Sequence, residues 1–238
     1  MGMSYGADMD PVLRRLPAAT WRALPALAVL GLTTLLAFVG SALTLGLAAP
    51  WTPAVVGVVS APVALWALDS LQGEIFDQAP ESGGWLRRLL LVEVLIAVPT
   101  ALAAWSGFVA EIAETAGSIF FQILAVAAAF ASLATALLAV VAIPLANMRR
   151  DVGVRAVLIA SIIAIGRRPL ASTAALLTGA ALTWLALTSF TGLFLFVAPL
   201  LVILAVAAAW STVARVGVTL PPLAPLRHLR KRTTQGMA

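Results

Sequence analysis

Six long apolar runs constrain this chain more than any other feature of its sequence. Each run is about 20 residues or longer, which is the length of α-helix that crosses the roughly 30 Å hydrocarbon core of a bilayer. We therefore expect six transmembrane helices, at residues 24–49, 53–71, 89–108, 118–146, 170–189 and 193–213.

The composition supports a membrane protein. Hydrophobic residues make up 62% of the chain and charged residues only 11%, whereas about 25% charged residues are typical of soluble domains. A soluble domain of this length could not bury so much apolar surface, but a bilayer solvates apolar faces directly. The predicted fold class is therefore an all-α, polytopic membrane helix bundle.

Several kinds of chemistry lack the residues they need. The chain has no cysteine, and its one histidine, His228, lies among arginines near the C-terminus. Thiolate catalysis, zinc–thiolate sites and a Ser-His-Asp triad within the membrane are excluded. The basic residues are scattered and form no single patch, so nucleic acid is not an expected partner. We expect no enzyme activity, cofactor or metal.

The arginines predict the orientation. With six alternating spans, every Lys and Arg falls on one side of the membrane, and the opposite side carries only Glu111 and Glu114. The positive-inside rule assigns the basic side to the cytoplasm. Residues 1–23 and the basic tail, residues 214–238, are thus expected to be cytoplasmic, and Glu111 and Glu114 are expected in a solvated outer loop.

One further apolar segment precedes the fifth span. It covers about 15 residues after Asp151, which is short for a span, and Arg155 would cost roughly 2.5–3.5 kcal/mol near a helix centre. A seventh span would also send the basic tail to the outside. We expect an interfacial helix on the cytoplasmic side, at residues 151–167.

Few polar residues fall within the spans. Glu93 and Gln122 are the candidates for an intramembrane polar site. Glu93 lies about one turn inside its span, so the alternatives are that it reaches the interface or pairs with an arginine. A hydrogen bond to a neighbouring helix is the structural alternative for Gln122. Asp69, at the end of the second span, is expected to be solvated.

Other residues are candidates for contacts rather than chemistry. A proline within a span kinks its helix and frees a carbonyl for a neighbour or ligand. Arginines around the interfacial helix can contact a partner or lipid, and a basic tail attracts anionic lipid. The candidate kinks are Pro62, Pro99, Pro144 and Pro199; the candidate partner or lipid contacts are Arg149, Arg150, Arg155, Arg167 and Arg168; the candidate anionic-lipid contacts in the tail are Arg227, Arg230, Lys231 and Arg232.

Several segments of the chain resemble those of a known family. They are Trp21-Arg-Ala-Leu24, the turn Pro50-Trp-Thr-Pro53, Ala64-Leu-Trp-Ala-Leu68, Gly83-Gly-Trp-Leu-Arg-Arg88, and the stretch from Pro144 through Arg150 to Arg167-Arg-Pro169. Through these segments the chain resembles the YesL-like family of small bacterial polytopic membrane proteins. The resemblance implies the bacterial cytoplasmic (inner) membrane and an accessory role near carbohydrate importers of the ATP-binding cassette type, with no catalytic residue.

Two functions follow from this reading. The first is an accessory or regulatory subunit of a transporter, whose partners are the bilayer and transporter subunits. The alternative is a small-solute transporter or permease in its own right, for which Glu93 is the first candidate residue. An oligomer of the chain with itself is left open.

Overall fold

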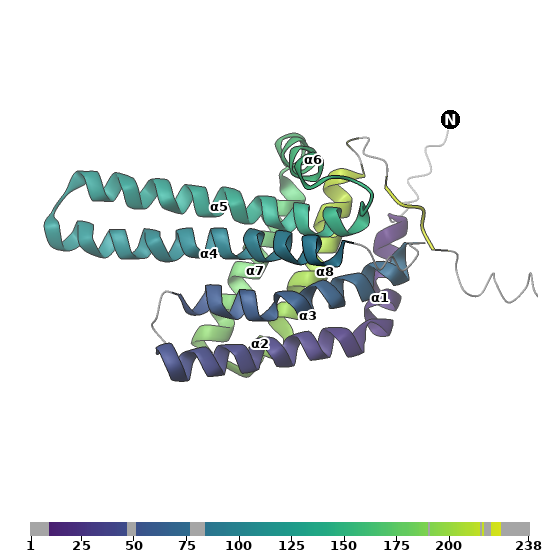
Figure 1. Cartoon of the computed structure of the whole chain (residues 1–238), viewed down its shortest axis with the longest axis horizontal. Helices are drawn as coiled ribbons and strands as arrows, with labels where there is room; N and C mark the ends of the chain where they lie inside the picture. The colour runs from purple at the N-terminus through teal and green to yellow at the C-terminus, as the bar shows by residue number, and fades with distance from the viewer. Residues whose placement is uncertain are drawn as a thin grey trace, which may run out of the picture.

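The computed structural model describes residues 10–46, 51–76, 84–189, 191–214, 216 and 220–224. Within these ranges the fold is all-α, with eight α-helices and one 3-10 turn (Figure 1). The elements are α1 (Pro11–Arg22), α2 (Leu24–Leu45), α3 (Thr52–Ile75), α4 (Trp85–Ala116), α5 (Ile119–Met148), α6 (Val154–Arg167), α7 (Leu170–Thr188), η1 (Thr191–Leu193) and α8 (Phe194–Val213).

Six of the described helices are long and apolar enough to cross a membrane, which confirms the predicted number of spans. They are α2, α3, α4, α5, α7 and α8. This is the architecture of a multi-pass membrane protein. Their ends differ from the expected ones mainly at three helices. Helix α2 ends at Leu45 instead of at residue 49, which lies outside the described residues, α3 continues four residues past the predicted end at Leu71, and α4 is longer at both ends.

The α4–α5 hairpin is the longest part of the bundle. Its helices have 32 and 30 residues, or about 48 and 45 Å at 1.5 Å per residue. They extend past the ends of α2 and α3 (Figure 1). Glu111 and Glu114, expected in a loop, lie on the last turns of α4. The chain reverses only at Gly117, whose φ of 62° suits a residue without a Cβ.

Polar contacts fix the two helices of this hairpin to each other. The Ser106 hydroxyl donates to the Ala125 carbonyl at 2.8 Å, and the Ser132 hydroxyl donates to the Pro99 carbonyl at 2.7 Å. Small residues at the interface, including Ala104, allow the backbones to approach closely. The hairpin is therefore a packed unit along its length.

An amphipathic helix precedes the first span, in the segment for which the sequence analysis predicted no element. Asp10 caps it by accepting a hydrogen bond from the Val12 amide at 3.0 Å, and Pro11 occupies the first helical position. Val12 and Ala19 form its buried face. The indole of Trp210 on α8 also donates to the Asp10 carboxylate, at 2.8 Å. These contacts hold α1 against the bundle.

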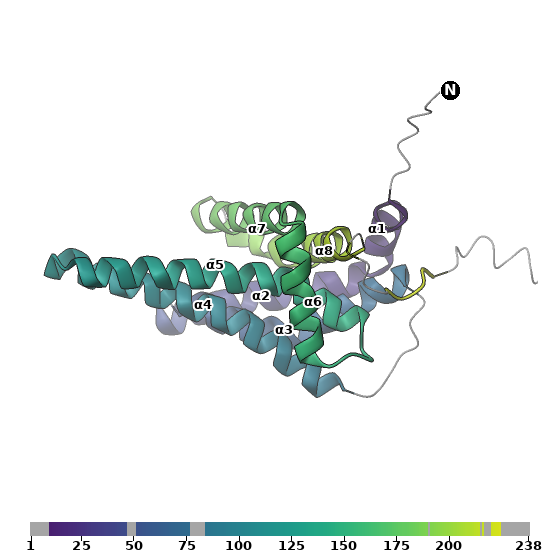
Figure 2. The same ribbon diagram turned by 90° about the horizontal axis from the view of Figure 1, so that it is seen from above.

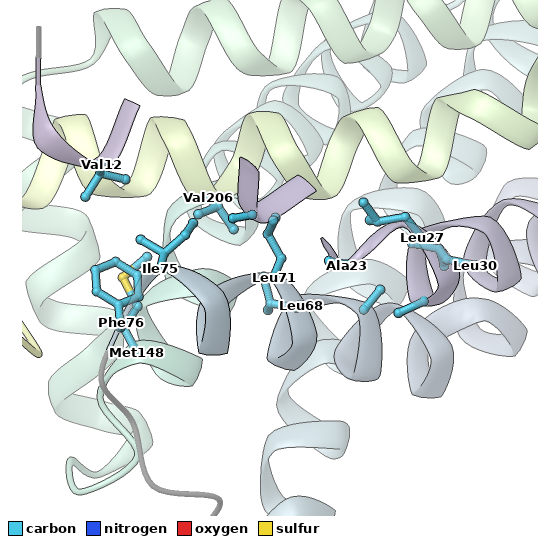
Figure 3. Packing of buried hydrophobic residues seen from close by; sticks show 13 residues of the cluster. Val12, Ala23, Leu27, Leu30, Leu68, Leu71, Ile75, Phe76, Met148 and Val206 are labelled. Atoms are coloured by element: carbon cyan, nitrogen blue, oxygen red, sulfur yellow. The ribbon is translucent and has the colours of Figure 1, made fainter. Parts of the chain in front are cut away.

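The main core lies beside α1, at one end of the bundle (Figure 3). Val12 of α1, Phe76 after α3 and Val206 of α8 are all buried there. The ring of Phe76 packs on Trp210, with centroids 5.5 Å apart. The C-terminal segment joins this core, because the Ala224 amide donates to the Ile75 carbonyl at 3.0 Å.

Helix α6 runs across the bundle instead of along it. It is seen end-on in Figure 1 and crosses α5 in Figure 2. Val157, Ser161 and Ala164, spaced one turn apart, form its buried face, and the Ser161 hydroxyl donates to the Val157 carbonyl at 2.9 Å. The helix begins at Val154, three residues after the predicted start.

Helices α2 and α8 approach most closely at Gly31. A Cβ on Gly31 would lie 2.0 Å from the Leu195 carbonyl oxygen, which belongs to the backbone and cannot rotate away. Gly40, nine residues further along α2, has open space around it.

We expect Gly31→Ala to lower stability by about 1–3 kcal/mol, because the two helices must separate. Gly40→Ala is the matched control and is expected to be neutral or up to about 1 kcal/mol stabilising, because alanine favours helix. The free energy or midpoint of unfolding, followed by circular dichroism in detergent, measures both. Equal effects of the two substitutions would contradict this close approach.

Candidate functional site

A cluster of polar side chains joins α3, α4 and α5 at the end of the bundle where α1 lies. The Asp69 carboxylate accepts hydrogen bonds from Arg88 at 2.9 Å and from Arg150 at 2.8 Å. The three side chains are 26%, 11% and 14% exposed, respectively. The sequence predicted that Asp69 is a solvated helix end. That prediction is wrong, because Asp69 is the centre of two ion pairs.

Two buried amides extend this cluster. The Asn147 amide donates to the Gln72 side-chain carbonyl at 2.8 Å, and Gln72 donates to the Pro144 backbone carbonyl at 3.1 Å. Arg88 also donates to the Asn147 side-chain oxygen. We call this cluster the polar network; its residues are Asp69, Gln72, Arg88, Asn147 and Arg150. It ties three helices together through charge-assisted and amide hydrogen bonds.

The polar network lacks the features of a chemical site. A cavity of about 30 Å³ lies beside Arg88 and Arg150, whereas small-molecule pockets have roughly 300–1,000 Å³. Among the described residues, no three His, Cys, Asp or Glu side chains gather to hold a metal. The carboxylate faces two guanidinium groups and no nucleophile. The network is suited to fixing helices, not to binding a solute.

The candidate arginines around α6 fall into three groups. Arg150 belongs to the polar network. Arg149 forms two hydrogen bonds of 3.0 Å with Asp151, and the bond from Arg149 lowers the pKa of the Asp151 carboxyl. Any stability from that pair is present at neutral pH and lost as the pH falls through the lowered pKa. The third group, Arg155, Arg167 and Arg168, is exposed and pairs with none of the described side chains.

A groove lies where α6 ends and α7 begins. Its volume is about 480 Å³ and it is open to the surroundings. Arg167 and Arg168 at the end of α6 and Ser211 of α8 are among its lining residues. Pro169, Leu170 and Ala171 complete the lining. Sequence reasoning marked the two arginines but gave no signal of a groove, because Ser211 is about 40 residues away in the chain.

The structure does not bring Glu93 and Gln122 together. Glu93 is half-buried on α4, five residues from Arg88, and Gln122 is exposed near the opposite end of α5. Because the two helices are antiparallel and turn at Gly117, the two side chains lie about 30 Å apart along the hairpin. Neither side chain forms a hydrogen bond or ion pair with the residues described.

All four candidate prolines lie inside helices. The carbonyls of Pro99 and Pro144 accept side-chain hydrogen bonds from neighbouring helices, given by Ser132 and Gln72. The partners at these two positions are thus other residues of the chain. Pro62 and Pro199 lie within α3 and α8. The tail candidates Arg227, Arg230, Lys231 and Arg232 are outside the described residues.

Exposed tryptophans mark two levels of the bundle. Trp85 and Trp105 on α4 are 44% and 47% exposed, and the 20 residues between them correspond to about 30 Å, the thickness of a bilayer's hydrocarbon core. Trp51, at the start of α3, is 18 residues from Asp69 of the same helix, and Trp105 is 17 residues from Arg88 along α4. Because Asp69 and Arg88 are in contact, Trp51 and Trp105 lie at about the same height above that ion pair along the bundle.

The α4–α5 hairpin continues about 16 Å beyond this second level. We call residues 106–125 the hairpin tip, because the Ser106–Ala125 hydrogen bond places Ala125 level with the start of this part of α4. Although Glu111 and Glu114 lie on it, most of its surface is apolar, and large apolar side chains are exposed there. They are Phe108, Ile119, Phe120, Ile123 and Leu124.

Comparison of the chain with models of protein families, with curated proteins and with solved structures found no match.

We expect Asp69→Asn to destabilise the protein, because it leaves two guanidinium groups without their shared carboxylate. Since Asp69 is partly exposed, the loss is about 2–3 kcal/mol, or roughly 5–10 °C in the unfolding midpoint. Thermal unfolding in detergent measures it. Asp151→Asn removes the exposed partner of Arg149 and serves as control, with a change within about 0.5 kcal/mol. Similar losses from both substitutions would show that the network has no special role.

Proposed function

We propose that the chain is an accessory or regulatory subunit of a membrane transporter and carries no catalytic site. One observation carries the proposal: the hairpin tip, an apolar helical element that extends beyond the aromatic level of the bundle. Contiguous exposed apolar surface outside a hydrocarbon phase is costly unless a partner covers it. The following paragraphs give the orientation, the contact surface and the alternative.

The proposed orientation places the polar network, α1, α6 and both termini on the cytoplasmic side. The described arginines lie at this end of the bundle, and the charged residues beyond the aromatic level at the other end are Glu111 and Glu114. The distribution of Lys and Arg supports this orientation through the positive-inside rule. The resemblance to the YesL-like family supports the cytoplasmic membrane of a bacterium as the location.

Helix α6 is proposed to lie at the cytoplasmic interface. Its crosswise direction (Figure 2) and its length of 14 residues suit a helix that lies in the membrane plane. Ile159, Ile162 and Ile163 are exposed opposite its buried face. Arg155 and Arg167 lie near its two ends, where long basic side chains reach the headgroups.

The hairpin tip is the proposed surface for the transporter. Phe120 and Ile123 are 68% and 65% exposed and lie about one turn apart on α5, so they share a face. Such large, rigidly held apolar side chains are typical anchors of a protein interface. The family resemblance makes the permease of a carbohydrate importer of the ATP-binding cassette type the first partner to test.

A small-solute transporter is the second candidate. The observation that favours it is Glu93, a half-buried carboxylate within α4 that pairs with none of the described side chains. The small cavity beside the polar network does not support a solute path there. Solute flux through the purified chain in liposomes, lost in Glu93→Gln, would favour this candidate over the accessory role.

The orientation can be tested directly because the chain has no cysteine. Single cysteines are introduced as Glu114→Cys on the hairpin tip and Arg155→Cys on α6. A membrane-impermeant maleimide is expected to label Glu114→Cys in intact cells and Arg155→Cys only after permeabilisation. The unsubstituted chain is the control. The reverse pattern, or labelling of both in intact cells, would refute the orientation.

The accessory role is tested by co-purification with the permease subunits of a carbohydrate importer expressed together with the chain in mild detergent. We expect the double substitution Phe120→Ser and Ile123→Ser to weaken the complex about 30-fold, as loss of about 2 kcal/mol from an interface anchor implies. Leu177→Ser on α7, exposed far from the tip, is the control and should leave binding unchanged. Recovery of the unsubstituted chain only as a lone monomer would contradict the role.

A further inference from the structure

The groove at the α6–α7 corner combines positive charge with apolar surface. Arg167 and Arg168 end α6, and Leu170, which is 84% exposed, begins α7. Ser211 of α8 contributes a polar side chain to the lining, and its hydroxyl donates to the Ala208 carbonyl at 3.0 Å. Three helices therefore build one open site of about 480 Å³.

The two arginines of the groove, like Arg155 on the same helix, differ from the paired arginines at this end of the bundle. Arg88 and Arg150 share Asp69, Arg149 pairs with Asp151, and Arg22 pairs with Glu74 at 3.0 Å. Of the other carboxylates described at this end, Asp10 accepts a hydrogen bond from Trp210, and Glu93, within α4, pairs with none of the described side chains. Arg167 and Arg168 pair with none of them. Two adjacent guanidinium groups without an internal counter-ion attract an anion from outside.

The shape of the guanidinium group narrows the class of anion. Arginine presents a planar fork of donors that matches two oxygens of a phosphate or carboxylate. The start of α7 adds the positive end of a helix dipole beside the pair. A phosphate between Arg167 and Arg168 would meet both groups at once.

The apolar side chains beside the groove indicate which kind of phosphate-containing ligand fits it. Leu170 stands at the groove, and Ile162 and Ile163 are exposed on the α6 turn that leads to it. A free phosphate ion would use none of this surface, whereas the acyl chains of a phospholipid would cover it. A ligand that fits both the arginine pair and the apolar surface is amphipathic.

We propose that this groove binds the headgroup of an anionic phospholipid. Arg167 and Arg168 bind the phosphate oxygens, Ser211 contributes a polar side chain to the lining, and the acyl chains pass Leu170 and the exposed isoleucines of α6. The proposal rests on the proposed orientation, which places the groove at the cytoplasmic interface, but not on the accessory role. Maleimide labelling tests the orientation separately, so a wrong orientation can be distinguished from a lack of lipid binding in the groove.

The test measures phosphatidylglycerol binding to the full chain in an uncharged detergent, by native mass spectrometry over a lipid titration. We expect Arg167→Gln with Arg168→Gln to weaken binding about tenfold or more. The matched control, Arg14→Gln with Arg87→Gln, removes two exposed arginines at the same end that lie outside α6 and should change binding less than threefold. Unfolding midpoints of both double variants should equal that of the unsubstituted chain.

Three further measurements keep the proposal falsifiable. Phosphatidylcholine should bind at least tenfold more weakly than phosphatidylglycerol, and inorganic phosphate should not displace the lipid at equal concentration. If the groove variant fails to fold, Arg167→Lys with Arg168→Lys keeps the charge and loses the planar fork, and should weaken binding about threefold to tenfold. Equal losses in the groove and control variants, or displacement by phosphate alone, would overturn the proposal.

Discussion

The Asp69 carboxylate, shared by Arg88 and Arg150, fixes the arrangement on which the other features depend. It lies where α3, α4 and α5 meet, and the buried amides of Gln72 and Asn147 continue its hydrogen bonds into the bundle. Charged groups held away from water must be paired, so these helices have one favourable register at this level. The height of the hairpin tip relative to the other helices follows from that register.

The two ends of the bundle consequently differ in character. At the end with the polar network, α1, α6 and the segment around Leu223 pack across the long helices and add buried surface. At the other end α4 and α5 run on past α2 and α3 (Figure 1), and the Ser106 hydroxyl joins them to each other through the Ala125 carbonyl. In the proposed function, the end with charge and crosswise helices lies at the membrane surface, and the exposed apolar side chains of the other end contact the partner.

Position in the tertiary structure also divides residues that look alike in the sequence. Arg149, Arg150 and Arg168 belong to one loop-and-helix segment, yet one forms an exposed pair, one joins the polar network and one lines an open groove. Their environments depend on carboxylates and helices from elsewhere in the chain. Asp69 and Arg150 are 81 positions apart, and no local pattern predicts their contact.

The sequence by itself determined the number of apolar helices and the absence of cysteine and histidine chemistry from the spans, because apolar length and composition are local properties. The end of α4 predicted from the sequence is wrong. The acidic residues near Glu111 suggest a loop, but the alanine and glutamate residues there favour helix. Only the tertiary structure decided that Asp69 is paired, that Glu93 and Gln122 are far apart, and that Arg167 and Arg168 line one groove with Ser211. These outcomes depend on contacts between distant segments, which packing alone determines.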